Sequence, residues 1–385
     1  MTKPLKIVID ARMYGLEHAG IGRYVMSLVS QIEKLDKKNE YFLLLRKKNY
    51  RSLQFKNKRF RKVLVDIPHY SFKEQIFLPG LLKKIKPDLV HFPHFNVPIF
   101  WRGKYVVTIH DLIKHQSRGM RTTTKLAPFY WFKYLAYQVN VFSAVKRAQK
   151  IITPSKWWKK ELVRRYHLKP EKIVVTYEEA GGFLKKKPTI SGSTALKRYG
   201  VTKPFVIYTG SLYPHKNVLR LVKAIICLND SNHFNKSLSL VIACVRSVFL
   251  ERFKKELEQI KGLNLVVLAG FVPDGELIAL YQEAEAFVTP SLLEGFCLTG
   301  LEAMAVGLPV IASNASCLPE IYGKAAIYFN PLNVDDMAKK IKKVIGDKKI
   351  RDELIKKGHQ QVKKYSWQKM AEQTLRVYDE SSIRL

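Results

Sequence analysis

Short runs of apolar residues alternate along the chain with stretches in which apolar residues recur three or four positions apart. Such runs are typical of parallel strands buried on both faces, and such stretches are typical of the helices that cover them. We interpret as strands residues 6–10, 41–45, 62–67, 88–92, 105–109, 150–153, 173–176, 205–208, 238–243, 264–268, 287–288 and 308–312. Helices are predicted at residues 20–35, 72–85, 156–166, 218–228, 298–306, 334–345 and from 365. This alternation predicts an α/β fold built on parallel sheets.

A polar segment divides the pattern into two halves. Residues 179–203 are rich in glycine, serine, threonine, lysine and proline, a composition typical of a linker. A chain of 385 residues is long enough for two domains that each bury a core. We therefore predict one Rossmann-like domain over residues 1–185, a second over 186–365, and a terminal helix over 366–385.

The most informative stretch is residues 286–313, which is predicted to fold as strand, loop, helix and strand. Gly295, Phe296, Cys297 and Leu298 lie just before the helix, so their amides are expected to face outward at its positive end. Such a helix start is a favourable site for a phosphate or diphosphate. A glycine at 307 is expected to end the helix.

Two carboxylates accompany this phosphate site, Glu294 before the helix and Glu302 within it, with seven residues between them. Phosphate repels an anion, so these side chains need a different partner. A carboxylate has two acceptor oxygens that suit a pair of adjacent hydroxyls. A diphosphate flanked by two diols describes a nucleotide sugar. The alternative interpretation is a surface Glu and a helix Glu in an ordinary βαβ unit.

The stretch Glu-Gly-Phe-Cys-Leu-Thr-Gly-Leu-Glu-Ala-Met-Ala-Val-Gly-Leu-Pro-Val resembles the donor-site signature of retaining glycosyltransferase family 4. The resemblance extends over nearly the whole chain and implies the GT-B fold, with two Rossmann-like domains facing across a cleft. It implies that Glu294 binds the hydroxyls of the donor sugar and Glu302 the ribose. It also implies a terminal helix that returns to the first domain.

A His-Asp pair follows the strand at residues 105–109, at the edge where parallel sheets bind ligands. His110, Asp111 and Leu112 match the family's His-Asp-Leu, which implies that His110 faces the donor sugar. Asp111 is expected on the acceptor side or as a residue that orients His110. A lone histidine outside this context is more often structural.

A basic pair lies after the first strand of the second half, in Gly210-Ser211-Leu212-Tyr213-Pro214-His215-Lys216-Asn217. This resembles the family's Gly-x-x-x-Pro-Arg-Lys-Asn, which implies that Lys216 neutralises the departing diphosphate. His215 replaces the arginine and is expected to be partly charged at neutral pH. The alternative for Lys216 is a solvent-exposed position.

Three further segments carry weaker signals. Gly20 and Gly22 are expected to let backbone approach the diphosphate or acceptor, and Arg23 to add charge on the acceptor side. A simple glycine turn and a solvated arginine remain alternatives. Val272, in Gly-Phe-Val-Pro, matches the turn that contacts the base of the nucleotide. Tyr177-Glu178-Glu179-Ala180 departs from the family's Asn-Gly, as Cys297 departs from the usual residue.

Charge is unevenly distributed along the chain. Residues 1–190 hold 40 basic and 13 acidic residues, a net +27 of the total +35. We interpret this as contact between the first domain and an anionic membrane. The basic residues 118–150 carry aromatic rings at helical spacing, which more often form a core. Because these rings run consecutively around the helix, some must face outward, and we interpret them as an interfacial, acceptor-side surface. A lysine-rich proteome without a special partner and a nucleic-acid ligand are the alternatives, and of these we expect no nucleic-acid partner.

The four cysteines are scattered, and residues 1–4 lead directly into a strand. We therefore expect reduced thiols, no signal peptide, and a cytoplasmic protein peripheral on the inner face of the membrane. The resemblance implies a metal-independent, retaining hexosyltransferase, with no cofactor, no metal site and a nucleotide-sugar donor. Such an enzyme would act on a glycan or lipid-linked acceptor in cell-surface polysaccharide synthesis, and the resemblance favours mannose as the transferred sugar. A nucleotide-sugar 2-epimerase and a catalytically inactive basic binding protein are the alternatives.

Overall fold

The computed structural model describes residues 3–119, 122–123, 126–180, 182–183, 186–231, 236–244, 249–260 and 263–382. Contacts divide the chain into two compact units. The first holds Met1–Leu112, Lys125–Glu178 and Ser366–Leu385, and the second holds Ile113–Thr124 and Glu179–Tyr365. The division after Glu178 falls at the start of the glycine-rich and lysine-rich segment, seven residues before the boundary proposed from the sequence.

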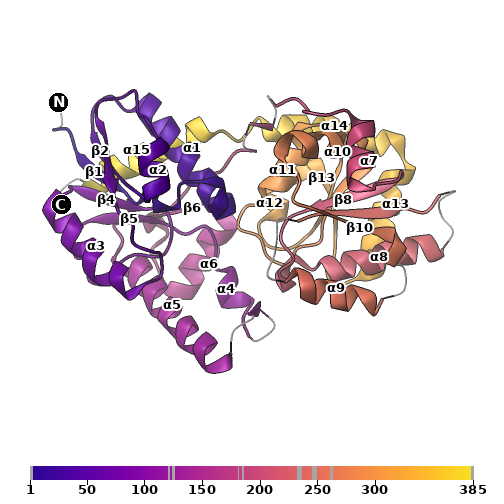
Figure 1. The fold of residues 1–385 in the computed structure, drawn as a ribbon, viewed down its shortest axis with the longest axis horizontal. Helices are drawn as coiled ribbons and strands as arrows, with labels where there is room; N and C mark the ends of the chain where they lie inside the picture. The colour runs from indigo at the N-terminus through magenta and orange to yellow at the C-terminus, as the bar shows by residue number, and fades with distance from the viewer. Residues whose placement is uncertain are drawn as a thin grey trace. The chain divides into compact units, whose positions relative to one another are not determined.

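The first unit contains a parallel sheet of seven strands in the order β3-β2-β1-β4-β5-β6-β7 (Figure 1). Its strands are β1 (Lys6–Ile9), β2 (Glu40–Leu45), β3 (Phe60–Leu64), β4 (Leu89–Phe92), β5 (Tyr105–Thr108), β6 (Lys150–Thr153) and β7 (Ile173–Val175). Strand β1 pairs with β2 on one side and β4 on the other, so the strand order reverses there. Open parallel sheets bind ligands at the carboxyl ends of the strands beside such a reversal.

Helices cover both faces of this sheet (Figure 1). They are α1 (Ala19–Leu35), α2 (Lys47–Ser52), α3 (Phe72–Ile85), α5 (Ala127–Arg147), α6 (Lys156–Tyr166) and α15 (Trp367–Ser382). Helices α1 and α15 share one core with β1 and β2, in which Met370 and Tyr378 are fully buried. Helix α15 is therefore part of the first unit's core. Ser155 caps α6 by accepting from the Trp158 amide.

The second unit contains a parallel sheet of six strands in the order β10-β9-β8-β11-β12-β13. Its strands are β8 (Phe205–Thr209), β9 (Ser239–Ala243), β10 (Val266–Gly270), β11 (Ala286–Thr289), β12 (Val310–Ser313) and β13 (Ala326–Phe329). Its helices are α4 (Ile113–Gln116), α7 (Gly192–Tyr199), α8 (Val218–Asp230), α9 (Leu250–Glu258), α10 (Asp274–Glu283), α11 (Leu298–Ala305), α12 (Leu318–Tyr322), α13 (Val334–Gly346) and α14 (Lys348–Val362). The predicted α/β class with two parallel sheets is confirmed.

Four strands differ clearly from the sequence-based prediction. Strands β10 and β12 begin two residues later than the predicted 264 and 308. Strand β3 runs over Phe60–Leu64 rather than 62–67, because Phe60 stacks on Tyr41 of β2 with ring centroids 4.6 Å apart. That contact sets the register two residues earlier. Strand β13 was not predicted, since its short apolar run follows a helix without a clear turn signal.

Candidate active site

The loop between β11 and α11 carries the first predicted carboxylate, Glu294. Both of its oxygens lie 2.7 Å from Lys216 Nζ, and the Ser291 hydroxyl donates to Oε1 at 2.6 Å. Glu294 is only 6% exposed. Burial by itself would raise the pKa of Glu294, but the Lys216 ammonium and the two hydrogen-bond donors outweigh burial, so the pKa lies below its ordinary value. Glu294 is therefore an ionised, buried carboxylate at neutral pH.

Lys216 and His215 come from a 3₁₀ turn, η6 (Pro214–Lys216), between β8 and α8. The Leu292 amide donates to the His215 carbonyl at 2.8 Å, which ties this turn to the Glu294 loop. The side chain of Asn217 adds a second tie by donating to the Pro290 carbonyl at 3.0 Å. The lysine and the carboxylate, 78 residues apart, are thus held together by backbone contacts as well as by charge.

The expectation that His215 is partly charged is wrong. Burial, and then the charge of Lys216, lower the pKa of His215 to about 4. The imidazole is therefore neutral at pH 7, and Lys216 is the charged member of the pair. Where the family pattern has an arginine, this chain places a neutral hydrogen-bonding group.

The start of α11 has an unusual backbone. Cys297, the residue before the helix, has a left-handed conformation with φ +65°, and its carbonyl accepts from the Tyr322 hydroxyl at 2.8 Å. Gly300 lies against the same tyrosine, and a Cβ there would come within 2.2 Å of the hydroxyl oxygen. Tyr322 therefore fixes the helix start where the sequence predicts a diphosphate site, and the predicted glycine turn is present at Gly307 with φ +80°.

The other donor-side residues differ in how they can act. Glu302 lies in the second turn of α11 and is 4% exposed. Phe296 is buried against Tyr365, with ring centroids 5.6 Å apart, so only its backbone is available to a ligand. Val272 is 8% exposed in the turn between β10 and α10. Gly295 and Leu298 lie within the same loop and helix start as Glu294.

In the first unit, His110 follows β5 and is held on three sides. Its Nε2 lies 3.0 Å from the Pro93 carbonyl, and its Nδ1 lies 3.3 Å from Glu178 Oε1. The ring of Tyr24 packs edge-on against it, with centroids 4.7 Å apart. A carbonyl can only accept, so Nε2 carries a proton and Nδ1 faces the carboxylate. No sequence motif assigned a role to Glu178, which lies 68 residues from His110 and meets it because β5, β6 and β7 are neighbours.

Four other predicted residues lie near the start of α1 or beside His110. Gly22 is buried, and a Cβ there would come within 1.8 Å of the Gly15 carbonyl, so the preceding loop requires a glycine. Gly20 is exposed with open space around it. Arg23 and Asp111 are half-buried in the first unit. The packing of the loop, rather than a ligand, thus accounts for Gly22.

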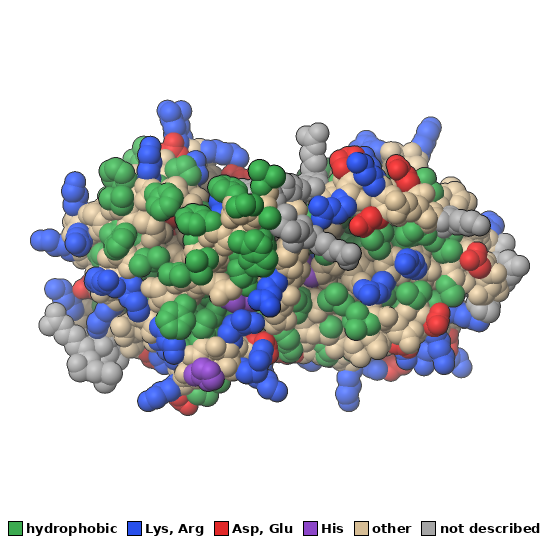
Figure 2. Space-filling view, turned by 90° about the horizontal axis from the view of Figure 1, so that it is seen from below, with side chains coloured by type: hydrophobic (Ala, Val, Ile, Leu, Met, Phe, Trp, Pro, Cys, Tyr) green, Lys and Arg blue, Asp and Glu red, His purple; other side chains and the backbone are tan. Residues whose placement is uncertain are grey.

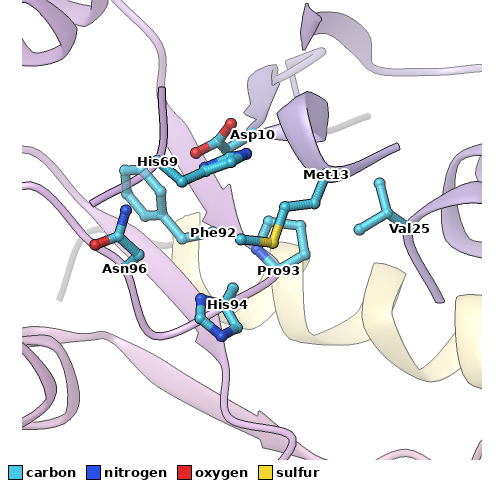
Figure 3. Close-up of a pocket in the computed structure, with 8 residues that line it drawn as sticks. All are labelled: Asp10, Met13, Val25, His69, Phe92, Pro93, His94 and Asn96. Carbon is cyan, nitrogen blue, oxygen red and sulfur yellow. The ribbon is translucent and has the colours of Figure 1, made fainter. Parts of the chain in front are cut away.

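A small pocket lies where β1 and β4 end, lined by Asp10, Met13, Val25, His69, Phe92, Pro93, His94 and Asn96 (Figure 3). Its volume is about 10 Å³, close to the space one water needs. His69 Nε2 is buried there without a hydrogen-bond partner among the described residues. Burial lowers the pKa of His69 to about 4, so this ring is neutral. No motif marks His69, because it lies in the loop between β3 and α3.

A buried ion cluster braces this edge of the sheet. The Arg12 guanidinium makes two hydrogen bonds to Asp10, at 2.7 and 2.6 Å, and a third to Glu74 at the start of α3. Asn96 donates to the other Glu74 oxygen. Arg12 and Glu74 are fully buried, so the cluster has a structural role. The carboxylates of Asp10 and Glu74 are engaged by Arg12 within it.

Within each unit the predicted residues are brought together. Lys216, His215 and Glu294 meet in the second unit, and His110 and Asp111 lie beside the switch point in the first. Across the described part of the chain, no group of three or more histidine, cysteine, aspartate or glutamate side chains could hold a metal ion. Within the same residues, no helix has both the length and the apolarity to span a bilayer.

Two family models match the chain. "Glycosyltransferase Family 4" matches residues 19–178, and "Glycosyl transferases group 1" matches residues 197–361. Together they cover most of both units. The Glu294 and Lys216 site lies within the second match, and His110 with Glu178 lies within the first.

Several curated relatives are mannosyltransferases. The O-antigen chain mannosyltransferase B of Escherichia coli is 26% identical over 77% of this chain and 75% of its own length. The O-antigen chain mannosyltransferase RfbU of Salmonella typhimurium is 26% identical over 60% of this chain and 62% of its own. The serotype-specific mannosyltransferase WbdA of Escherichia coli is 28% identical over 72% of this chain and 33% of its own.

Solved structures show the same fold at low identity. WaaG, described as a glycosyltransferase involved in lipopolysaccharide biosynthesis, superposes with a TM-score of 0.72 at 15% identity, over 97% of this chain and 99% of its own. The sucrose-phosphate synthase of Thermosynechococcus elongatus superposes with a TM-score of 0.70 at 17% identity, over 98% and 99%. These likenesses concern the fold.

Proposed function

The chain belongs to glycosyltransferase family 4 with the GT-B fold, and from this premise we propose that it transfers a hexosyl group, mannose in the first instance, from a nucleotide-diphosphate sugar. The acceptor is a glycan or lipid-linked saccharide in the synthesis of a cell-surface polysaccharide. The observation that carries the proposal is the buried pair of Lys216 and Glu294 beside the start of α11. An ammonium for the diphosphate and a carboxylate for the sugar are there held within one hydrogen bond of each other.

The charges of the donor-site residues determine the role of each toward the diphosphate. Transfer of the sugar leaves a nucleoside diphosphate, which carries more negative charge at the transition state than in the bound donor. Lys216 and the amides at Gly295–Leu298 stabilise that developing charge, and positioned donors of this kind are worth most in a water-poor site. Neutral His215 supplies a hydrogen bond and no second charge.

Glu294 and Glu302 bind the two ends of the donor that carry hydroxyls. Glu294 is ionised and fixed by Lys216 and Ser291, so its orientation is set before the sugar arrives. Glu302 binds the ribose and Val272 contacts the base. On the acceptor side we place His110 at the sugar, with Gly20, Arg23 and Asp111 near the acceptor.

Three finer features belong to the proposal. The sugar keeps its anomeric configuration, because the acceptor attacks on the face from which the diphosphate leaves, with a phosphate oxygen as base. The reaction needs no metal, since Lys216 and the helix start take the part that a cation would have. The protein is cytoplasmic, and its basic first unit contacts the anionic inner face of a membrane.

The purified protein is first screened for binding to a panel of nucleotide sugars. Transfer assays follow, with GDP-mannose as the first donor. Glu294→Ala is expected to reduce transfer at least a hundredfold while circular dichroism shows that the fold is kept. The matched control is Glu258→Ala, an exposed glutamate at the end of α9. Equal activity in Glu294→Ala and wild type would contradict the site. Release of an epimerised sugar without acceptor would favour the 2-epimerase instead.

Proton NMR of the product reports the anomeric configuration, and assays with and without EDTA report the metal requirement. An inverted product would overturn retention, and activity that disappears with EDTA and returns with a divalent cation would overturn metal independence. Neither result would affect the assignment of Lys216 and Glu294 to the donor, which Glu294→Ala tests separately.

A further inference from the structure

One surface of the first unit is apolar where it should be polar. Eight large apolar side chains of α3 and α5 are between 48% and 80% exposed, and Phe100 in the loop after β4 is 61% exposed. We call them the α3–α5 face, and they are Phe72, Ile76, Phe77, Phe100, Phe129, Trp131, Phe132, Leu135 and Phe142. Figure 2, which views the molecule from below, shows hydrophobic side chains gathered among lysines and arginines over this part of the first unit.

Helix α5 carries large apolar side chains on its exposed side as well as on its buried side. The buried side holds Tyr130, Tyr134, Tyr137, Asn140, Val141, Ala144 and Val145, whereas Phe132, Leu135 and Phe142 point outward. A surface helix normally buries its apolar stripe and exposes a polar one. The exposed stripe therefore serves something outside the unit.

Helices α3 and α5 are tied into one surface by the loop after β4. The Ile99 amide donates to Gln75 of α3 at 2.7 Å, and the Ile99 carbonyl accepts from Arg147 of α5 at 2.8 Å. Asn140 of α5 also donates to the Val97 carbonyl. Phe100, the next residue of this loop, adds an exposed ring directly after the residue that joins the two helices. The α3–α5 face is thus built on a fixed frame.

The charges of this face have one sign. Helix α5 contains basic residues and no aspartate or glutamate, and Glu74, the single acidic residue of α3, is buried against Arg12. Lys133 Nζ lies 4.4 Å from the centre of the Phe129 ring, so a cation borders the apolar stripe. On α3, Lys83 and Lys84 are exposed in the last turn.

From this combination we propose that the α3–α5 face lies flat on an anionic membrane and inserts its rings among the lipids. The proposal deepens the membrane contact proposed above, because it names the surface and the partner. A bilayer with acidic headgroups accepts aromatic and aliphatic side chains at its interface and attracts the lysines that border them. A second copy of the chain is disfavoured, since pairing this face with itself would bring the cations together.

The consequence concerns the acceptor. Helix α5 also packs beside the loop of Phe95, whose ring lies 4.9 Å from that of Tyr137, and this loop continues from the small pocket at His94. A membrane held on the α3–α5 face therefore lies on the helices that frame the switch point of the first unit. A lipid-linked acceptor would reach His110 from the surface on which the protein rests.

The experiment measures binding of the full-length protein to vesicles by co-flotation. Vesicles of phosphatidylcholine alone are compared with vesicles containing about a third phosphatidylglycerol. Wild type is expected to bind the anionic vesicles at least tenfold more tightly. The double variant Phe132→Ser, Leu135→Ser is expected to lose at least tenfold in binding, and Lys133→Glu several-fold, with the latter loss shrinking in high salt. Leu332→Ser, at an exposed leucine of the second unit, is the control and should bind as wild type does.

Every outcome decides the inference. Equal binding of wild type and the double variant overturns it. So does a wild type that binds anionic vesicles no more tightly than phosphatidylcholine vesicles. A dimer in sedimentation velocity that the double variant converts to monomer assigns the face to a second copy instead. If the double variant fails to fold, Phe72→Ser, Ile76→Ser tests the same face from α3. Transfer to a soluble acceptor is measured in parallel. Vesicle binding without transferase activity would contradict the proposed function alone, and transferase activity without vesicle binding would contradict this inference alone.

A second, independent observation concerns Glu178. Its carboxylate is nearly buried, lies 3.3 Å from His110 Nδ1, and occupies the segment that departs from the family's Asn-Gly. We infer that Glu178 is a positioning residue, which fixes the ring of His110 by its contact with Nδ1 while the Pro93 carbonyl fixes Nε2. The inference rests on the proposed role of His110 at the donor sugar.

The test combines kinetics with stability. Glu178→Ala is expected to lower kcat roughly tenfold to a hundredfold with little change in KM for the donor, and Glu178→Gln to recover part of the loss. The double variant with His110→Ala should be no worse than His110→Ala alone. Glu171→Ala, an exposed glutamate just before β7, is the control. Additive losses, or wild-type kcat in Glu178→Ala, would overturn the inference. If no transferase activity exists, a coupling between the two residues in unfolding experiments would leave the pairing structural and remove its catalytic meaning.

Discussion

Replacing Lys216 by methionine should destabilise the second unit through Glu294. In the native structure both carboxylate oxygens lie 2.7 Å from the ammonium, and the lysine and glutamate side chains are 18% and 7% exposed. Methionine keeps most of the apolar stem and removes the charge. Glu294 is then left buried with the Ser291 hydroxyl and its remaining neighbours. The desolvation that Lys216 had outweighed now acts on an ion without its counterion.

The magnitude follows from the geometry. Removing one partner of a fully buried ion pair costs roughly 3–5 kcal/mol. The Ser291 bond remains and Lys216 is partly exposed, so we expect a loss of about 2–3 kcal/mol in the free energy of unfolding. In Lys216→Met, Glu294→Gln the buried charge is gone, and most of that loss should be recovered. The coupling between the two positions should then be about 2 kcal/mol.

The matched control is another lysine–glutamate pair of the same unit. Lys203 Nζ lies 2.9 Å from Glu283 Oε2, but these side chains are 49% and 30% exposed. Such a solvated pair contributes roughly 0–1 kcal/mol, so Lys203→Met should change the stability by less than about 1 kcal/mol. The two substitutions remove the same chemical group at nearly the same distance. They differ chiefly in burial, which is the quantity under test, and Lys216 also contacts both carboxylate oxygens where Lys203 contacts one.

The assay has to report the second unit by itself. All five tryptophans, at positions 101, 131, 157, 158 and 367, lie in the first unit. Tryptophan fluorescence therefore does not report unfolding of the second unit directly. Native-state hydrogen exchange at amides of β11 and α8 measures the opening of the second unit directly. The reasoning would be refuted if Lys216→Met and Lys203→Met lost the same stability, or if Glu294→Gln failed to rescue Lys216→Met.

The same pair gives a dependence on pH. The pKa of Glu294 is lowered in the folded protein, so its contribution to stability is present above the ordinary carboxyl pKa of 4.5 and is lost as the pH falls below that value. Lys216→Met should remove this acid-side loss, because the counterion that lowers the pKa is gone. Exchange rates of wild type and variant between pH 6 and pH 4, corrected for intrinsic exchange, check the sign.

Three other predictions concern stability. The pKa of His215 is lowered to about 4, so the free energy of unfolding is highest above the ordinary pKa of 6.5 and decreases as the pH falls from 6.5 toward 4. In His215→Gln this decrease should be smaller by roughly 2 kcal/mol, as measured by hydrogen exchange. Tyr378→Phe removes the 2.6 Å bond to fully buried His91 Nδ1, which should cost the first unit about 1–3 kcal/mol in urea unfolding followed by tryptophan fluorescence. Gly22→Ala should lower the melting temperature by several degrees, since overpacking costs about 1–3 kcal/mol, whereas Gly20→Ala, with open space around it, should not. An unchanged pH profile, an unchanged urea midpoint, or equal effects of the two glycine variants would contradict the respective prediction.

What the sequence determined is local. Period and run length located nearly every strand, since a strand of a covered parallel sheet has to be apolar throughout and its helices have to be amphipathic. The Glu294 and Glu302 spacing and the loop before α11 were visible for the same reason, because both carboxylates belong to one continuous segment. Ser155 could be recognised as a cap because capping involves residues three apart.

Tertiary structure decided which distant groups meet and which faces are covered. Lys216 meets Glu294 over 78 residues and Glu178 meets His110 over 68, and no local pattern encodes such pairs. The charge of His215 depends on burial and on its neighbour's ammonium, which the sequence could not supply, and so that expectation was wrong. The aromatic spacing of α5 showed that the helix has faces, but only the packed structure placed its tyrosines inside and its phenylalanines outside. Periodicity fixes the existence of a stripe; the neighbours that the fold supplies fix whether it is buried.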